Sequence, residues 1–317
     1  GYPEPGLTTA YDGSDLISPD TVPLNGGFLL RTLGLSINPS MRGRMRPSGP
    51  GYDAIWSHEI GVVLRSELAG VNIGDNVYGA QMSYLDNHRE YNVFKELAPF
   101  TFLKNQYNLP WSTFVGVAGM PGKTAYFGWK EYSKARGGET IFVTTGGGPI
   151  GSLVIQLAKA DGLKVIASAR SDEKVSFMKA LGADVEFNYK TTDTKVVLER
   201  EGPIDIYWDN VGGSILDLAL SNSNVGARFI ECGMILGYNA TPTPIQARKS
   251  ITIQGLLVHH LQAKYDEEFY NVVPEKLANG ELKYKEHIWD GLESVGEAIL
   301  AVQKGLNTAK AIIRVSE

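Results

Sequence analysis

The chain has one cysteine, no excess of basic residues and no long apolar run, and each scarcity excludes a class of protein. Cys232 alone cannot form an internal disulfide or a cysteine-rich zinc lobe, and it suits a reducing compartment. The net charge of -5 gives no basic footprint for nucleic acid, so a small-molecule partner is expected. No run approaches the length of a membrane span, and the start GYPEPGLTTAYDG has the features of neither a signal peptide nor a transit sequence. We therefore expect a cytoplasmic protein without a membrane partner.

With 317 residues and 43% hydrophobic content, the chain is long enough for two domains with buried cores. The pattern of hydrophobic and turn-forming residues changes near residue 115. Before that point, short β-rich runs such as GGFLLRTLGLSI (26–37) and IGVVLRSELAG (60–70) are separated by Gly, Pro and Asn, as in an irregular β domain. After it, strand and helix patterns alternate, which predicts an α/β fold with a doubly wound parallel sheet covered on both faces.

The second half can be divided into expected elements by its hydrophobic periodicity. A helix over SDEKVSFMKALGAD (171–184) is expected to begin at an N-cap, Ser171 or Asp172, and to end at Gly182. Another helix is expected over PIGSLVIQLAKADG (149–162). Expected strands are ETIFVTT (139–145), KVIASA (164–169), VEFNY (185–189), IDIYWDNVGG (204–213), ARFIECG (227–233) and SITIQGLLV (250–258), and residues 284–315 read as strand, helix and strand.

A glycine loop joins the first of these strands to the first helix. Gly146, Gly148 and Gly151 form a complete G-x-G-x-x-G motif, in which the glycines allow a tight turn, close approach of a pyrophosphate and close packing of helix on strand. Backbone N–H groups at the helix start then face the phosphate charge, and Pro149 costs little in the first turn. A glycine-rich turn without a ligand is the alternative, but the strand before and the helix after favour a phosphate cradle.

The residues after the second strand indicate which dinucleotide binds. An NAD-specific site expects Asp or Glu about 20 residues past the loop. This chain has SAR (168–170) there, so that Ser168 and Arg170 offer donors, and Lys174 lies one turn into the next helix. The pattern favours a 2′-phosphate and hence NADPH. The alternative is that Arg170 and Lys174 are ordinary surface charges, and an N-cap role accounts for Asp172.

Several separated stretches together resemble the zinc-independent medium-chain dehydrogenases/reductases, in the branch of prostaglandin reductases and alkenal double-bond reductases. The similarity runs from about residue 29 to the C-terminus, and the order and spacing of the stretches make it specific. The matching stretches are LSINPSMRGRM (35–45), GMPGKTAYFG (119–128), TTGGGPIGS (144–152), SDEKVSFMKALGAD (171–184), FNYK (187–190), DNVGG (209–213), CGMILGYN (232–239) and YKEH (284–287).

The resemblance implies three segments: a GroES-like substrate and catalytic domain at 1–114, a Rossmann NADP-binding domain at 115–284, and a C-terminal segment at 285–317 that returns to the first domain. It also implies cofactor contacts, grouped by the part of the dinucleotide that they meet. These are Gly148, Pro149, Ile150 and Gly151 at the pyrophosphate, Lys174 and Tyr189 at the 2′-phosphate end, Asn210 and the run Cys232, Gly233 to Tyr238 along the cofactor, and Leu256, Leu257, Val258 and Asn307 near the nicotinamide.

The reaction that the resemblance implies is reduction of an alkene conjugated to a carbonyl group, with hydride passing from NADPH to the β carbon. Tyr238 matches a tyrosine that serves the carbonyl oxygen or supports the nicotinamide ribose, and a packing role is its alternative. The stretch SINPSMRGRM departs from the family pattern, because Asn38 and Ser40 stand where Asp and a substrate-facing Tyr are usual. We expect a shifted or broader substrate range, unless Tyr52 or Tyr84 compensates for the lost phenol.

The sequence offers no convincing metal site. WSHEIGVV (56–63) is similar to the Gly-His-Glu stretch of zinc-dependent relatives, but His58 and Glu59 have no cysteine partner in the first domain. The adjacent His259 and His260 would point to opposite faces if they lay on a strand. We expect no bound metal, and we expect Cys232 to be a small buried residue and not a nucleophile.

Two alternatives to an enal or enone reductase remain open. An NADPH quinone oxidoreductase would share the cofactor cradle, although CGMILGYN and YKEH favour the first interpretation. An NADPH-binding protein with little catalysis is the alternative from another class, because Ser40 has replaced the expected tyrosine. By resemblance we also expect a homodimer, joined through an edge strand in or near SITIQGLLV.

Overall fold

The structure is a computed structural model that describes residues 1–45, 57–79, 88–98, 100–239 and 250–316. Tyr52 and Tyr84, expected as compensating donors, lie outside the described residues. The chain divides into two compact units. One spans Val117–Lys285, and the other joins Tyr2–Gly116 to Glu286–Glu317.

The first unit contains a parallel sheet whose six described strands follow the order β11-β10-β9-β6-β7-β8. The doubly wound α/β fold predicted from the sequence is confirmed. The strands are β6 (Thr140–Val143), β7 (Lys164–Ala169), β8 (Val185–Asn188), β9 (Ile204–Asp209), β10 (Ser223–Glu231) and β11 (Thr252–Gly255). The helices are α1 (Met120–Gly128), α2 (Pro149–Ala160), α3 (Asp172–Ala180), α4 (Thr194–Glu201), α5 (Ser214–Ser221), α6 (Ile235–Tyr238) and α7 (Gln262–Ala278).

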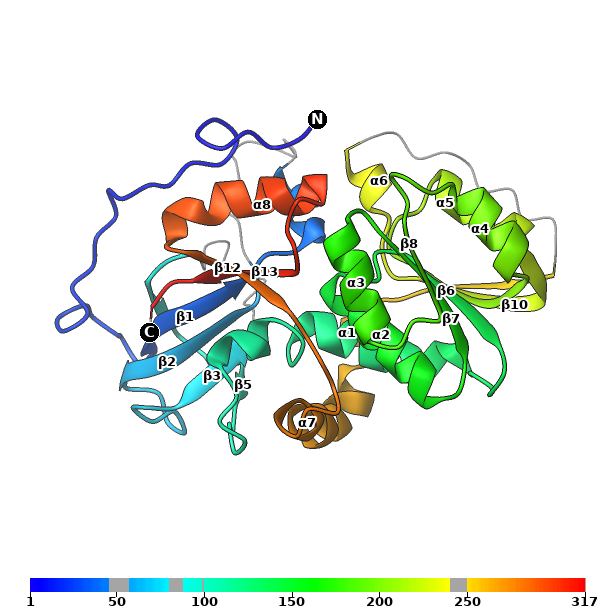
Figure 1. The fold of residues 1–317 in the computed structure, drawn as a ribbon. Helices are drawn as coiled ribbons and strands as arrows, with labels where there is room; N and C mark the ends of the chain where they lie inside the picture. The colour runs from blue at the N-terminus through cyan, green and yellow to red at the C-terminus, as the bar shows by residue number, and fades with distance from the viewer. Residues whose placement is uncertain (46–56, 80–87, 99, 240–249, 317) are drawn as a thin grey trace. The chain divides into compact units, whose positions relative to one another are not determined.

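Alternating side chains give this sheet two apolar faces, because successive residues of a strand point in opposite directions. Phe142, Tyr207 and Phe229 face a core that includes residues of α4 and α5, with ring centroids 5.4 Å apart for Phe142–Tyr207 and 5.2 Å for Tyr207–Phe229. Ala167 faces the other side, close to Ile155 of α2. Figure 1 shows α2 and α3 on one side of the sheet and α4 and α5 on the other.

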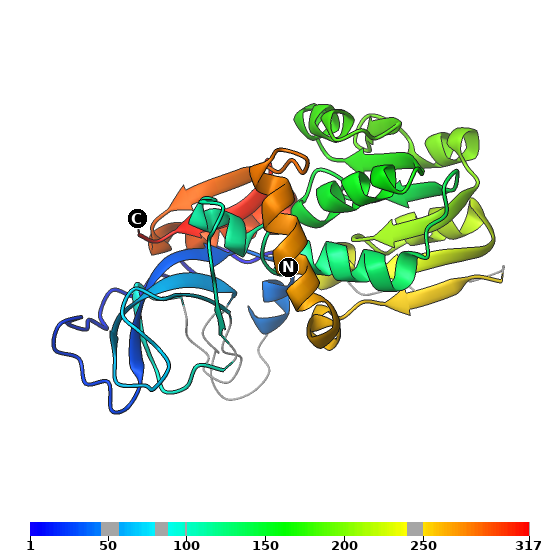
Figure 2. The same cartoon turned by 90° about the horizontal axis from the view of Figure 1, so that it is seen from below.

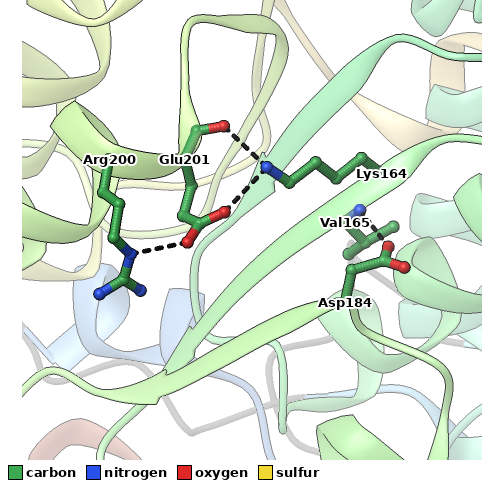
Figure 3. A network of polar contacts seen from close by, with 5 residues as sticks. All are labelled: Lys164, Val165, Asp184, Arg200 and Glu201. Atoms are coloured by element: carbon green, nitrogen blue, oxygen red, sulfur yellow. Dashed lines mark hydrogen bonds and ion pairs between the residues drawn. The ribbon is translucent and has the colours of Figure 1, made fainter.

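Ion pairs and a hydrogen bond stabilise the edge of this sheet at which the strands begin. Lys164 donates to the Glu201 carboxylate at 2.8 Å, and Arg200 donates to the same carboxylate at 2.7 Å. Asp184 accepts from the Val165 backbone at 2.7 Å (Figure 3). Lys164 opens β7 and Glu201 ends α4, so these contacts fix the amino-terminal edge and leave the opposite edge for a ligand.

The helices α7 and α1 pack against each other (Figure 2), and a polar contact joins them. Lys123 is 2% exposed, and its ammonium group lies 2.8 Å from an Asp266 carboxylate oxygen and 4.5 Å from the centre of the Tyr270 ring. Burial lowers the pKa of Lys123, and the hydrogen bond that Lys123 donates to Asp266 opposes this effect. The sequence pattern did not predict this pairing, because an isolated lysine inside GMPGKTAYFG reads as a surface residue.

The second unit is built on a sheet in which β12-β13-β1-β2-β3-β5 are neighbours and β4 also pairs with β1. Apart from the parallel pair β12–β13, its pairings are antiparallel, as expected of a β domain. Its elements are β1 (Phe28–Ser36), β2 (Glu59–Ser66), β3 (Asn76–Gly79), β4 (Tyr91–Phe94), β5 (Thr101–Phe102), β12 (Glu286–Asp290), α8 (Val295–Lys304) and β13 (Lys310–Arg314). β13 pairs with β1, and the C-terminal strand, helix and strand belong to the second unit.

Candidate functional site

The glycine loop after β6 has the geometry of a cradle for a phosphate. Gly148 is the N-cap of α2 and Pro149 its first residue. A Cβ atom on Gly151 would lie 2.6 Å from the Thr145 carbonyl oxygen and 2.8 Å from the Gly146 Cα, so the helix packs closer to the strand than any other residue allows. Gly148, Pro149 and Ile150 are partly exposed. The first turn of α2 therefore offers its positive end to an anion.

Two cations lie beside this loop. A Cβ atom on Gly147 would lie 2.8 Å from the Lys174 Cβ and 2.9 Å from its Cγ, so the stem of Lys174 crosses the loop. Burial lowers the pKa of Lys174, and the positive charge of Arg170 lowers it further. Bringing two cations together is unfavourable unless an anion joins them, which suits a doubly charged phosphate.

The acidic residue Asp172 is held by a contact within the chain and is not the N-cap of α3. Ser171 caps the helix by accepting from the Lys174 backbone, as one of the two predicted caps. Asp172 instead accepts from the Asn188 side chain at 2.8 Å. Ser168 is 5% exposed in β7, and its role as a donor stays a prediction. Tyr189 is 40% exposed. It follows β8, which is the neighbour of β7 in the sheet, and Arg170 follows β7.

At the edge where the strands end, the loop after β9 contacts Thr144, just before the glycine loop, and the loop after β10 contacts the end of β9. The Asn210 side chain donates to the Thr144 carbonyl at 2.7 Å, and the Asn210 backbone donates to the Thr144 hydroxyl at 2.9 Å. The backbones of Cys232 and Gly233 donate to the Asp209 carbonyl at 3.0 and 3.1 Å. Three predicted parts of the site, Thr144–Gly151, Asn210 and Cys232–Tyr238, thus belong to one connected set of backbone contacts.

Tyr238 ends α6, and a Cβ atom on Gly233 would lie 3.3 Å from its hydroxyl oxygen. Burial raises the pKa of Tyr238, while a hydrogen bond with the Met234 backbone lowers it by less. The phenol therefore stays protonated in neutral solution and can donate a hydrogen bond.

Cys232 is partly buried, and burial raises its pKa to about 12. A nucleophilic cysteine needs the opposite shift, because the thiolate is the reactive form. The thiol of Cys232 is not activated.

The remaining predicted cofactor contacts belong to two different units of the chain. Leu256 packs near Gly128 and Trp208 of the first unit, Leu257 is 50% exposed, and Val258 begins a short 3-10 helix, η4 (Val258–His260). Asn307 belongs to the second unit, where its side chain donates to the Ala309 carbonyl at 2.6 Å. Its role toward the cofactor stays a prediction.

The histidines have structural surroundings. His259 and His260 lie in η4 and not on a strand, so the argument from opposite strand faces was wrong in its premise. His58 stacks on Tyr78 with ring centroids 5.5 Å apart, and Glu59 accepts from the Thr32 hydroxyl at 3.3 Å. Within the described parts of the chain, no three His, Cys, Asp or Glu side chains group as metal ligands. In the same residues, no helix is both long and apolar enough to cross a membrane.

Two buried ionisable groups were missed by the sequence analysis. Lys310 of β13 is 3% exposed and donates to the Ile37 carbonyl at 2.6 Å and to the Asn38 side chain at 3.1 Å. Burial lowers its pKa to about 7, with Glu286 opposing that shift. Glu231, at the end of the apolar strand β10, lies beside Asp209. A charged residue directly after the apolar pair Phe229 and Ile230 was the available signal for the second group.

Comparisons with known proteins agree with this geometry. Residues 149–276 match the family model for zinc-binding dehydrogenases. The chain is 36% identical over 340 residues to the NADP-dependent oxidoreductase RED1 of Cochliobolus heterostrophus, covering 100% of this chain and 95% of the relative. It is 36% identical over 308 residues to 2-alkenal reductase (NADP(+)-dependent) of Nicotiana tabacum, covering 91% and 87%. The crystal structure of CurA in complex with NADPH from Vibrio vulnificus superposes with a TM-score of 0.85 at 30% identity, covering 97% of this chain and 94% of CurA.

The fold and the glycine cradle define a nucleotide-dependent oxidoreductase with a Rossmann unit and a GroES-like unit. The chain belongs to the medium-chain dehydrogenase/reductase superfamily, in its zinc-independent reductase branch. It is an NADP-dependent oxidoreductase whose cofactor is NADPH. The cradle at Gly151 and the cations Arg170 and Lys174 fit that cofactor.

Proposed function

We propose that this protein reduces the carbon-carbon double bond of α,β-unsaturated aldehydes and ketones, with hydride delivered to the β carbon. Bound NADPH supplies the hydride. The observation that carries the proposal is Tyr238, whose protonated phenol lies beside Gly233 on the loop that follows β10. The tobacco relative, named a 2-alkenal reductase that depends on NADP(+), supports the same reaction.

In this proposal the protein binds the cofactor, orients the substrate and stabilises the charge that forms on the substrate during hydride transfer. As the β carbon accepts hydride, negative charge builds on the carbonyl oxygen of the substrate. A hydrogen bond from the Tyr238 hydroxyl to that oxygen stabilises the charge, and removing such a donor costs about 100-fold or more in rate. The proton remains on the phenol oxygen, because burial raises the pKa of Tyr238, and water supplies the proton that completes the reduction at the α carbon.

We further propose that the cofactor occupies the edge of the sheet where β6, β7, β9 and β10 end. The first turn of α2 serves the pyrophosphate, and Lys174 with Arg170 serves the 2′-phosphate. The full proposed set is Gly148, Pro149, Ile150 and Gly151; Arg170, Lys174 and Tyr189; Asn210, Cys232, Gly233 and Tyr238; and Leu256, Leu257, Val258 and Asn307.

The test is consumption of NADPH in the presence of an enal, an enone and a quinone. Turnover of the enal or the enone, with NADPH strongly preferred to NADH, supports the proposal. Turnover of the quinone alone would replace it by a quinone oxidoreductase. Tight NADPH binding without any turnover would indicate a binding protein.

Ser40 offers a test of substrate range. It is exposed in the 3-10 helix η1 (Pro39–Met45), whose Pro39 carbonyl accepts from the Gln303 side chain at 2.8 Å. Because an added ring at an exposed position leaves this anchor intact, Ser40→Tyr is expected to fold. We predict that it lowers kcat/KM for a bulky aryl enone relative to a small enal by roughly tenfold, as pocket contacts of this size do. Steady-state rates for both substrates measure the ratio.

Ser40→Ala is the matched control and should leave the ratio at the wild-type value, because it adds no ring. An unchanged profile in Ser40→Tyr would mean that this position does not contact the substrate.

We propose that the protein acts in the cytosol as a homodimer joined at β11. This strand is at an edge of the six-stranded sheet, and Ile253 on it is 40% exposed. An apolar edge strand needs a partner or a cover, and a second copy would continue the sheet. The single cysteine, Cys232, is consistent with a reducing compartment.

Ile253→Lys is expected to weaken the dimer by about 100-fold or more, because two like charges would meet at a symmetric interface. Sedimentation velocity over a concentration series measures the change. Val196→Lys, at a half-exposed position on α4, is the control and should leave the dimer intact. A wild-type chain that is monomeric at every concentration would refute the interface.

A further inference from the structure

Two carboxyl groups lie side by side at the ends of neighbouring strands. Glu231 is the last residue of β10 and Asp209 the last residue of β9, and the two are partners in the parallel register. Their side chains therefore project from the same face of the sheet. The groups are close enough to share a hydrogen bond. Asp209 is 0% exposed, and both carboxylate oxygens of Glu231 are buried.

Three oxygen atoms of this pair have no hydrogen-bond donor unless one of the two carboxyl groups is protonated. In the described part of the chain, both oxygens of Glu231 and the Oδ2 of Asp209 are buried without a hydrogen-bond donor. Carboxylate oxygens are acceptors only, so they cannot bond to each other unless one group is protonated. Burying a polar atom without a partner costs free energy, and two buried anions in contact cost more. The pair is stable as one carboxylate and one carboxylic acid.

The other oxygen of Asp209 organises the turn that follows β9. Its Oδ1 accepts from the Val211 backbone at 2.7 Å, the Gly212 backbone at 2.9 Å and the Tyr207 hydroxyl at 2.9 Å. Gly212 has a φ of 70°, a conformation that side chains other than glycine rarely adopt. The carboxylate of Asp209 therefore holds in place the turn that begins with Asn210, a proposed cofactor contact.

The elements around Glu231 bring no cation to the pair. β9 contributes Asp209 and the neutral Tyr207, and the segment after β10 contributes Cys232 and Tyr238. β11 reads TIQG and carries no titratable side chain. On α5, Asp217 is exposed. Among described residues, the charge that raises the pKa of Glu231 is that of Asp209.

We propose that Glu231 is a positioning residue for the cofactor: it keeps one proton that it shares with Asp209, and loss of this proton disrupts the turn 209–213 and weakens NADPH binding. The inference rests on the proposed placement of the dinucleotide along Asn210 and Cys232. When the proton leaves, two adjacent buried anions repel each other beneath a site that must accept an anionic cofactor. The hydrogen bonds from Val211 and Gly212 to Asp209 then rearrange.

The pH at which this happens follows from the surroundings of the pair. Burial, with a contribution from the Asp209 charge, raises the pKa of Glu231 to about 8. Because the folded chain binds the proton more tightly than the unfolded chain, this group stabilises the fold at acidic pH, and the contribution is lost as the pH rises through about 8. NADPH affinity should fall as the pH rises above about 8, where the folded chain loses this proton.

The test is a fluorescence titration of NADPH at several pH values with the full-length protein and Glu231→Gln. In the wild type we expect the dissociation constant to rise by up to about tenfold for each pH unit above about 8, the limit for one linked proton. Glutamine donates an amide N–H to Asp209 at every pH, so the variant should keep the low-pH affinity. Titration of Lys174 affects both proteins equally and cancels in the ratio of their dissociation constants.

Glu275→Gln, at an exposed position of α7, is the control and should follow the wild type. Glu231→Val replaces the glutamine variant if the latter does not fold. Because valine carries no proton, this variant must also lose the rise in the NADPH dissociation constant above about pH 8. An identical pH profile in the wild type and the variants would overturn the role of Glu231 while leaving NADPH binding and enone turnover intact. Failure of the wild type to bind NADPH at any pH would instead refute the proposed function.

Discussion

Replacing Lys174 by alanine is expected to lower kcat/KM for NADPH by roughly 100-fold and to leave kcat/KM for NADH nearly unchanged. The stem of Lys174 crosses the glycine loop at Gly147, which places its ammonium group beside the loop and Arg170. Truncating one partner of a desolvated ion pair costs about 2–5 kcal/mol. NADH lacks the 2′-phosphate, so it makes no such ion pair with Lys174 and loses nothing when the side chain is removed. Initial rates with each cofactor at a fixed enone concentration give the ratio.

Lys179→Ala is the matched control. This lysine lies on the same helix but is 77% exposed and 3.8 Å from Glu186, so its loss should change neither rate. Equal losses with NADPH and NADH in Lys174→Ala would contradict the proposed role, because they would indicate damage to the loop and not the loss of a phosphate contact.

The second large effect is expected at Tyr238. Tyr238→Phe should lower kcat by about 100-fold, because the substrate oxygen loses a hydrogen-bond donor in the transition state. NADPH affinity should change little, since the ring still fills the space beside Gly233. Because burial raises the pKa of the phenol, the wild-type rate should not fall through loss of the Tyr238 proton in the neutral range. Single-turnover rates with an enone separate the chemical step from cofactor binding.

Tyr11→Phe, an exposed position of the second unit, should retain the wild-type rate and serves as the control. Full kcat in Tyr238→Phe would show that the phenol is not the donor. A rise in the NADPH dissociation constant with unchanged kcat would assign Tyr238 to cofactor binding alone.

Local signals explain how much of the fold could be predicted from the sequence. β7 was predicted at its observed bounds, because KVIASA is an apolar run between a glycine turn and a helix cap. Ser171 was one of two predicted caps, with Asp172, because the residue types that accept from the first N–H groups of a helix are few. The helix expected over 149–162 ends at Ala160, since helix ends depend on small energy differences.

Features set by contacts between distant residues were missed. α7 has weak amphipathic spacing and an internal Pro274, and its packing on α1 uses the Lys123–Asp266 pair. The Glu231–Asp209 pair depends on the register of β10 against β9, which sequence spacing does not give. The environment of Asn38 was also unpredictable, because its partner Lys310 lies near the opposite end of the chain.

The site was predictable to the extent that it follows motifs. The glycine loop and Lys174 come from the βαβ pattern, whereas Asn210, Tyr189 and Leu256–Val258 came from resemblance alone. A contact between a side chain and a distant backbone group, such as Asn210 to Thr144, leaves no mark in composition or periodicity. For the same reason, the roles of these residues toward the cofactor remain predictions.

The central claim is NADPH-dependent reduction of a conjugated double bond, and product analysis tests it most directly. The purified protein would be incubated with NADPH and a medium-chain enal or an aryl enone, with loss of NADPH absorbance followed and the product identified by mass spectrometry and NMR. We predict the saturated aldehyde or ketone in equal amount to the NADPH oxidised, with hydride from labelled NADPH at the β carbon. An allylic alcohol, or turnover only with a quinone, would contradict the account.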